Sequence, residues 1–337
     1  MKEYFGKLPN GESCHLYTIS YAQISAKVTD LGATLVRLYI PGKDGKVDDV
    51  VLGYDSPAGY LESQTYFGAT VGRNANRMRN ACFVLGGTTW SVPANEGSNN
   101  LHSGPDGYNI RLWSVLSHTA DTIVLGLRSP HGDQGFPGNA DIRVTYKVEA
   151  DGIRIIYDAV SDRDTVFNFT NHSYFNLAGH THPEKAMEQI LSMPARFFNP
   201  DDAANIPTGE LRNVKGTPMD FRTPKPLGRD ISADYEPLHL QGGYDHNFEV
   251  FCNPAAILSD SDSGRSLAVY TDRPGIQIYT ANFTKGAGKD GMVYEPRCGV
   301  CLETQFYPDA VNHPEWPRPF YKAGQNYHSE TKYRFSW

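Results

Sequence analysis

Two histidines and one glutamate stand in sequence surroundings that side-chain packing alone does not explain. His102 lies in the loop-like stretch NNLHSG, His172 in TNHSYFNL, and Glu303 in the apolar run GVCLETQFYP. A carboxylate and an imidazole are the minimum equipment for moving a proton from one oxygen atom to another near neutral pH. The run around Glu303 predicts a buried strand, where a charged side chain must be paired or take part in chemistry. We therefore regard these three residues as candidate site residues.

The two histidines also have simpler interpretations. A single histidine in a loop is usually exposed and without a function, and this is the alternative for His102. His172 differs because Phe167 and Phe169 give it an apolar setting, while Asn171 offers a hydrogen-bond partner. Its alternative is a buried structural histidine with satisfied hydrogen bonds.

The stretch GRNANRM contains two arginines, Arg73 and Arg77, around Asn74 and Asn76. Guanidinium and amide groups offer several donors in one plane, which suits them to binding hydroxyls or a carboxylate. The alternative is a surface turn with solvated arginines, and the residues by themselves favour neither interpretation.

Asp245 in GGYDHNFEV comes just before an alternating strand pattern, a position that directs a side chain towards the mouth of a site. Its alternative is a turn in which the aspartate bonds to its own backbone. His246 points to the opposite face of any strand, so the two residues are not expected to share one role.

Composition and charge limit the classes of protein that the chain can belong to. It has 337 residues and a net charge of -7, with 32 Gly, 22 Pro and 20 Tyr. The negative charge and the lack of a basic stripe argue against a nucleic-acid partner. No apolar signal segment or stretch of transmembrane length is present, so we expect no membrane partner. We expect a cytoplasmic protein whose cysteines are reduced.

Strand patterns recur at short intervals along the chain. Between residues 141 and 150, Ile142, Val144, Tyr146 and Val148 alternate with polar residues, which is the period of a half-buried antiparallel strand. Clusters of Gly, Asp, Asn and Pro separate such patterns. Further stretches with strand character are 122–129, 152–160, 266–272 and 275–283.

Many short strands joined by turns predict an all-β protein, a large antiparallel β-sandwich or barrel with few short helices. One helix is expected in 56–66, with Ser56 as its N-cap and Pro57 at its first position. No repeat or charged linker divides the chain, which predicts a single domain over residues 1–337. The Pro-rich stretch 194–240 predicts an extended excursion, and such loops often border a binding site.

Three patterns resemble cofactor or metal motifs without their structural context. KGAGKDG has the glycine spacing of a dinucleotide site, but a strand-like segment follows it where the motif needs a helix. CGVC (298–301) has no second CxxC, so we expect buried thiols. His180 and His182 lack a third ligand, and we expect them to be solvent-exposed. The sequence therefore predicts no cofactor and no metal.

Six motifs follow one another along the chain: GRNANRM, NNLHSG, TNHSYFNL, GGYDHNF, PGIQIYTANF and CLETQFYPDAVN. Their residues and their order resemble those of the aldose 1-epimerases, the galactose mutarotases. IPTGEL and GTPMDF also match loops of that family, and the resemblance continues through KYRF near the C-terminus. It implies a galactose mutarotase-like supersandwich with a sugar cleft on one concave sheet face.

The resemblance also implies an activity, the interconversion of the α and β anomers of a free aldose without a cofactor. By position in the motifs, Glu303 resembles the general base and His172 the general acid. Phe283 is a candidate apolar wall for the sugar. The residues that resemble the sugar-binding set are His102, Asp245, Arg77, Asn76 and Gln277.

Mutarotation requires removal of a proton from O1 and delivery of one to the ring oxygen O5, followed by rotation about C1–C2 and closure. We expect Glu303 to take the O1 proton while His172, as imidazolium, protonates O5. A nearby Glu303 is expected to raise the pKa of His172 and keep it charged.

Competing functions stay open on the sequence alone. A glycosidase would pair Asp245 with Glu303, a hexose-6-phosphate 1-epimerase would need a basic cluster, and a carbohydrate-binding module would bind without catalysis. The partner expected in each case is a small monosaccharide or its derivative, bound by a monomer or a homodimer. The stretch 178–187 departs from the family pattern, which leaves the sugar preference open.

Overall fold

The computed structural model describes residues 1–337 and consists mainly of antiparallel strands joined by loops. Strand β13 (Ala140–Glu149) illustrates why these residues form strands. Ile142, Val144, Tyr146 and Val148 are all buried, and the residues between them are exposed or half-buried, as the period-two pattern predicted. The all-β prediction is confirmed.

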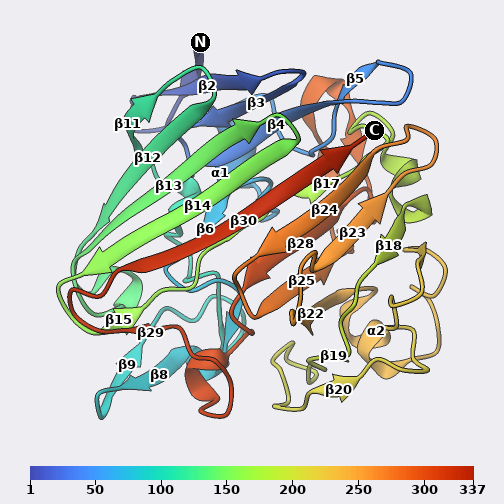
Figure 1. Cartoon of the computed structure of the whole chain (residues 1–337). Coiled ribbons are helices and arrows are strands. Elements are labelled where there is room, and N and C mark those ends of the chain that lie inside the picture. The colour runs from blue at the N-terminus through green and yellow to red at the C-terminus, as the bar shows by residue number, and fades with distance from the viewer.

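The largest sheet has nine strands in the order β11-β12-β13-β14-β30-β24-β23-β18-β21. It runs across the front of Figure 1, with the C-terminal strand β30 near its centre. Its other strands are β11 (Ser114–His118), β12 (Thr122–Ser129), β14 (Gly152–Ser161), β30 (Tyr327–Ser336), β24 (Ser266–Thr271), β23 (Ala256–Ser259), β18 (Ile190–Ser192) and β21 (Lys225–Pro226).

A second sheet of six strands, in the order β17-β28-β25-β22-β19-β20, packs behind the first. The hydroxyl of Tyr333 on β30 donates a 2.8 Å hydrogen bond to the carbonyl oxygen of Leu302 on β28, which joins the two layers. The six strands are β17 (Tyr174–Phe175), β28 (Val300–Gln305), β25 (Gly275–Tyr279), β22 (Asp245–Glu249), β19 (Phe197–Phe198) and β20 (Arg212–Asn213).

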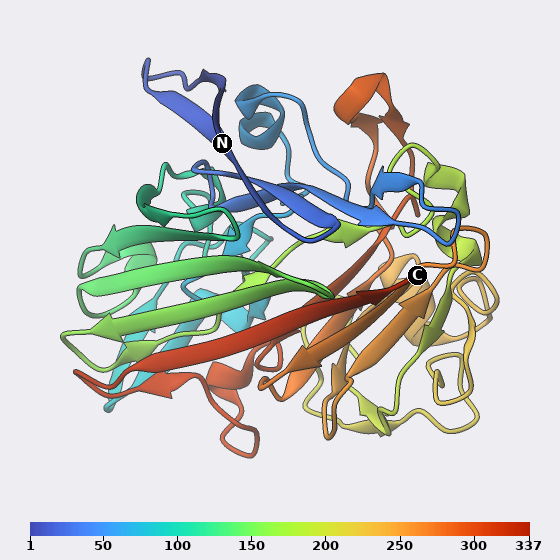
Figure 2. The same ribbon diagram turned by 45° about the horizontal axis from the view of Figure 1, so that its top comes forward.

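The N-terminal strands form a third sheet in the order β1 to β5. Figure 2 shows these strands, in blue, beside the green strands of the large sheet, and β2 and β3 contact β12 and β13. They are β1 (Lys2–Lys7), β2 (Ser13–Tyr21), β3 (Ile24–Thr29), β4 (Thr34–Pro41) and β5 (Val47–Asp49).

Two-stranded ribbons and short helices complete the structure. The ribbons are β6 (Thr70–Val71) with β16 (Thr170–Asn171), β7 (Arg77–Met78) with β10 (Asn100–Leu101), β8 (Cys82–Leu85) with β9 (Thr88–Ser91), β15 (Thr165–Val166) with β29 (Phe320–Tyr321), and β26 (Gly286–Ala287) with β27 (Val293–Tyr294). The α-helices are α1 (Pro57–Glu62) and α2 (Glu236–Gln241), and the 3-10 turns are Arg79–Ala81, Tyr108–Ile110, Asp133–Gly135, Pro183–Glu188, Lys289–Gly291 and Ala310–Asn312.

Helix α1 confirms the helix predicted in 56–66, with Pro57 at its start, although Ser56 makes no capping hydrogen bond through its side chain. None of the helices has the length and apolar character that crossing a bilayer requires.

Arg73 is a structural residue and contributes nothing to a surface or a site. It is fully buried, and its guanidinium donates hydrogen bonds to the carbonyl oxygens of Pro137 and Gly138 at 2.8 and 3.1 Å. It also donates to the side chains of Thr165 and Ser129. Both sequence interpretations of Arg73, as a ligand-binding or a solvated arginine, are therefore wrong. Its guanidinium is the donor for the buried carbonyl of Gly138, and it shares the carbonyl of Pro137 with the hydroxyl of Thr165.

Replacing Arg73 by Met tests this role, because Met fills much of the volume but leaves the carbonyl of Gly138 without a donor and the carbonyl of Pro137 with the hydroxyl of Thr165 alone. We expect a loss of about 3–5 kcal/mol in the free energy of unfolding, measured by urea denaturation. The matched control is Arg229→Met at an exposed arginine paired with Asp230, where the loss should stay below about 1 kcal/mol. Equal losses in the two variants would contradict the structural role of Arg73.

Candidate functional site

One face of the six-stranded sheet carries a row of polar side chains. The strand register sets Glu303 on β28 opposite Gln277 on β25, and Gln277 opposite Asn247 on β22. In the adjacent row, Tyr279 lies opposite both Cys301 and Asp245. Because side chains alternate along a strand, these two rows share the face directed away from the nine-stranded sheet.

The residues between these rows point the other way, into the core. Leu302 and Ile278 belong to the main apolar cluster, and His246 is fully buried against the ring of Phe198. The prediction that Asp245 and His246 would point to opposite faces is confirmed. A single sheet thus presents one apolar face for packing and one polar face for binding.

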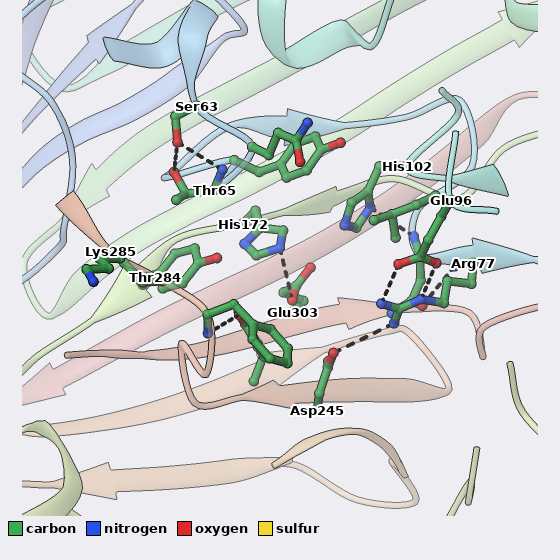
Figure 3. Close-up of a pocket in the computed structure, with 17 residues that line it drawn as sticks. Ser63, Thr65, Arg77, Glu96, His102, His172, Asp245, Thr284, Lys285 and Glu303 are labelled. Atoms are coloured by element: carbon green, nitrogen blue, oxygen red, sulfur yellow. Dashed lines mark hydrogen bonds and ion pairs between the residues drawn. The ribbon is translucent and has the colours of Figure 1, made fainter. Parts of the chain in front are cut away.

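His172 lies above this polar face, in the short connection between β16 and β17. Its Nε2 is 3.6 Å from Oε1 of Glu303, and both side chains are buried (Figure 3). The ring is stacked between Tyr66 and Tyr174, with centroid distances of 5.7 and 5.1 Å. Its Nδ1 is 3.5 Å from Sγ of Cys301. Two residues far apart in sequence are therefore close enough to contact one small molecule.

The β7–β10 ribbon positions His102 beside His172, with their ring centroids 5.4 Å apart. The backbone N–H of Asn76 donates a 3.1 Å hydrogen bond to Nδ1 of His102. A neutral imidazole has one N–H, so this bond assigns the proton to Nε2, which is then a donor. Asn76 and His102 both have positive φ values, 62° and 51°, that ordinary residues rarely adopt. Asn and His adopt this region more readily than most residue types, so they suit these two positions.

Arg77, on the same ribbon, lies between two carboxylates. Its Nε and Nη2 donate to Oε2 and Oε1 of Glu96 at 2.7 and 2.9 Å, and Nη1 lies 3.7 Å from Oδ2 of Asp245 (Figure 3). Gln277 donates a 2.7 Å hydrogen bond from Nε2 to Oδ1 of Asp245. Gln277 does not line the cavity. It holds Asp245 from behind, whereas the sequence resemblance implied a direct contact with the sugar.

These groups surround a cavity of about 400 Å³, within the range of small-molecule sites. Of the residues expected from the sequence, Glu303, His172, His102, Asn76, Arg77, Asp245 and the largely exposed Phe283 line it. The lining residues that sequence reasoning missed are Ser63, Gln64, Thr65, Tyr66, Glu96, Leu101, Tyr174, Tyr279, Thr284 and Lys285. Tyr174 and Tyr279 lie inside recognised motifs, whereas no pattern marks the loop residues.

Burial controls the protonation of the central pair. It raises the pKa of Glu303 well above its ordinary value, with a further contribution from the nearby Asp245 carboxylate. Burial also lowers the pKa of His172 to about 4. The expectation that Glu303 would raise the pKa of His172 is therefore wrong, because removal of water disfavours both charges. Burial therefore favours the uncharged form of each of the two groups.

His102, His172 and Glu303 bring metal-binding atom types within 4.8 Å of one another. A histidine that binds a metal through one ring nitrogen usually donates a hydrogen bond from the other. Nδ1 of His102 instead accepts the N–H of Asn76, so its Nε2 carries the proton and has no free lone pair. This donor set fits a metal ion poorly and fits a hydroxyl-bearing ligand better.

Outside the cavity, the structure decides other expectations. Residues 286–291 of KGAGKDG form β26 and the turn that leads to β27. Cys298 and Cys301 are buried free thiols, as predicted. His182 is exposed, but His180 is buried, with Nδ1 3.1 Å from the hydroxyl of Tyr294 and Nε2 3.1 Å from Asp290. Its expected exposure is wrong because these partners come from a distant hairpin. No residue of 194–240 lines the cavity, so this excursion does not border it as expected.

Comparison with known proteins places these features in a family. The sequence model of the family described as aldose 1-epimerase matches residues 15–334. The galactose mutarotase of Mus musculus is 39% identical over 344 residues, which cover 98% of this chain and 97% of that protein. The aldose 1-epimerase of Escherichia coli strain K12 is 36% identical over 337 residues, which cover 97% and 96%.

Solved structures of similar proteins have the same architecture. An aldose epimerase homologue from C. elegans has a TM-score of 0.88 and 31% identity, covering 95% of this chain and 98% of that chain. The galactose 1-epimerase of Lactobacillus acidophilus NCFM has a TM-score of 0.87 and 27% identity, covering 100% and 98%. These similarities confirm the galactose mutarotase-like sandwich predicted from the sequence.

Proposed function

Since the chain belongs to the aldose 1-epimerase family and is an isomerase acting on carbohydrates, we propose that it interconverts the α and β anomers of free hexoses such as galactose and glucose. The observation that carries this proposal is the pairing of His172 Nε2 with Glu303 Oε1 at 3.6 Å inside a buried cavity. A general acid and a general base so close together can reach O1 and O5 of one pyranose.

The reaction needs one proton removed and one delivered, and the pair carries one proton. In one placement Glu303 is a carboxylate that accepts the proton of O1 while imidazolium His172 donates to O5. In the other placement the roles are exchanged, with Glu303 as the acid and neutral His172 as the base. When the ring closes from the aldehyde, each group has the protonation state that ring opening left it in, and the transfers run in the opposite direction. A complete turnover therefore restores the starting state.

The remaining cavity residues are proposed to hold the sugar. Nε2–H of His102 offers a donor, the side chain of Asn76 an amide, and Arg77 and Asp245 a charged donor and acceptor. Gln277 fixes Asp245 from below. Phe283, whose side chain is exposed at the cavity, offers an apolar surface for the C–H groups of a sugar ring.

The charges favour a free sugar over a sugar phosphate. Arg77 is occupied by Glu96, and Arg73 is buried elsewhere, so Lys285 is the cavity cation without a carboxylate partner. A phosphate dianion would also meet the carboxylates of Glu96 and Asp245. We further propose that residues 1–337 act as one cytoplasmic domain, either as a monomer or as a homodimer. The apolar core supports the single domain, because its largest cluster includes residues from Tyr17 to Phe335.

Polarimetry of freshly dissolved α-D-galactose and α-D-glucose tests the function and the pair. The wild-type protein should accelerate the change in optical rotation. Glu303→Gln and His172→Asn should each lower kcat by about 10²–10⁴-fold, with a smaller change in KM, because each removes one proton-transfer group. Thermal melting of the same samples reports whether the variants are folded.

The outcomes separate the competing functions. Sugar binding by the wild-type protein without acceleration would indicate a binding module, and release of nitrophenol from nitrophenyl glycosides would indicate a glycosidase. Acceleration restricted to hexose 6-phosphates would indicate the phosphate-specific enzyme. Full activity in either folded variant would retire the assignment of the pair.

The pH dependence of kcat/KM follows from the one-proton state of the pair. Below about pH 4, His172 gains a proton, so the pair carries two protons and lacks a base. Above the raised pKa of Glu303, this residue loses its proton and the pair lacks an acid. We expect a bell-shaped profile whose acidic limb lies near pH 4, measured with the polarimetric assay across pH in buffers of constant ionic strength. An acidic limb near 6.5, the pKa of an ordinary histidine, would contradict the effect of burial.

A further inference from the structure

Glu96 lines the cavity but has no part in the proposed proton transfers. It lies on the loop between β9 and β10, and its backbone pairs with that of Asn99. The side chain lines the cavity and is 31% exposed, so solvation would satisfy its charge without any partner. Both of its oxygens nevertheless bind Arg77, at 2.7 and 2.9 Å (Figure 3).

The opposite edge of the same guanidinium faces a second carboxylate, with which it forms a loose ion pair but no hydrogen bond. Nη1 of Arg77 and Oδ2 of Asp245 are 3.7 Å apart, which is beyond hydrogen-bond distance. The other oxygen of Asp245, Oδ1, accepts its hydrogen bond from Gln277. One donor atom and one acceptor atom therefore face each other across a narrow gap at the cavity.

A hydroxyl group is suited to this gap because it accepts and donates at once. A sugar hydroxyl there would accept from Nη1 of Arg77 and donate to Oδ2 of Asp245. A direct ion pair between the two side chains, with an N···O distance of about 2.8 Å, would use the N–H and the lone pair that face each other and would compete with the hydroxyl for them. Arg77 and Asp245 can therefore bind one hydroxyl together as long as they do not pair closely with each other.

We propose that Glu96 is a positioning residue that holds Arg77 away from Asp245, so that the two side chains together bind one sugar hydroxyl. The two-bond contact with Glu96 outweighs the attraction of Asp245 for the same guanidinium, because bidentate arginine–carboxylate pairs have a fixed fork geometry. This inference rests on the proposed function, since it concerns how the same cavity holds its sugar.

Loss of Glu96 should weaken binding more than chemistry. Arg77 would close onto Asp245, and a sugar would have to break this ion pair before it could bind. His172 and Glu303 contact neither end of the Arg77–Glu96 pair, so the proton transfers would proceed with little change. A weakened ground-state interaction raises KM while kcat stays nearly constant.

The experiment measures kcat and KM by polarimetry for the wild-type protein, Glu96→Gln and Glu96→Ala. We expect KM to rise about tenfold or more and kcat to change less than about threefold, which is the effect of losing a charge-assisted hydrogen bond. Crystal structures of the variants should show Nη1 of Arg77 about 2.8 Å from Oδ2 of Asp245. The matched control is Glu210→Gln, because Glu210 binds Arg212 in the same two-bond manner outside the cavity, at 2.9 and 2.7 Å, and both constants should stay unchanged.

A second measurement separates positioning from a general effect on the fold. In the Asp245→Asn background the carboxylate that faces Nη1 of Arg77 is gone, and apart from Glu96 itself only Asp201 remains among the carboxylates near the guanidinium. Adding Glu96→Gln in this background should therefore raise KM by less than about threefold. The inference is overturned if Glu96→Gln leaves KM unchanged, if Arg77 keeps its distance from Asp245, or if the effect is the same in both backgrounds. A wild-type protein that does not accelerate mutarotation would overturn the proposed function instead.

Discussion

Burial of His172 against Glu303 is the constraint on which the rest of the site depends. In water Glu303 would be charged near neutral pH and His172 partly charged, whereas burial makes each charge costly and moves both pKa values towards the uncharged forms. The proposed ring opening needs two groups that exchange the roles of acid and base, and this pair offers them. The rings of Tyr66 and Tyr174 stack on His172 and contribute to its burial.

The fold can support this polar centre because the six-stranded sheet has two faces of different character. Leu302 and its neighbours pack against the nine-stranded sheet, and the layer on the other face is polar although it is buried. One oxygen of Glu303 has no protein partner there, and unpaired buried polar atoms of this kind are costly. A hydroxyl of a bound sugar can donate to such an atom. The unpaired atom therefore lowers the stability of the fold but raises the affinity of the cavity for a hydroxyl-rich ligand.

The sequence predicted those features that local patterns encode. Period-two alternation identified β12, β13 and β14, and a charge inside an apolar run identified Glu303. Arg73 and Arg77 are indistinguishable in GRNANRM, yet one is enclosed by carbonyls of residues 137 and 138 and the other faces the cavity. The role of each arginine depends on contacts with residues that are distant in the sequence.

The pKa of His172 is a similar case. Proximity to Glu303 and burial act in opposite directions, and sequence spacing contains no information on the depth of burial. Glu96 was missed because its loop has no pattern beyond a turn, and its contact with Arg77 forms only in the folded chain. The family resemblance pointed to a part of the cavity lining, namely Glu303, His172, His102, Asn76, Arg77 and Asp245, but not to the protonation or the mutual restraints of these residues.

The most direct test of the central claim is whether His172 and Glu303 act as one unit. Exchange between the α and β signals of galactose at equilibrium, measured by magnetisation transfer in NMR, reports the rate of anomer interconversion for each variant. If the two share one proton, the double variant Glu303→Gln/His172→Asn should be no slower than the slower single variant, because either loss already disables the pair. Losses that multiply in the double variant would show two independent catalysts and contradict the account.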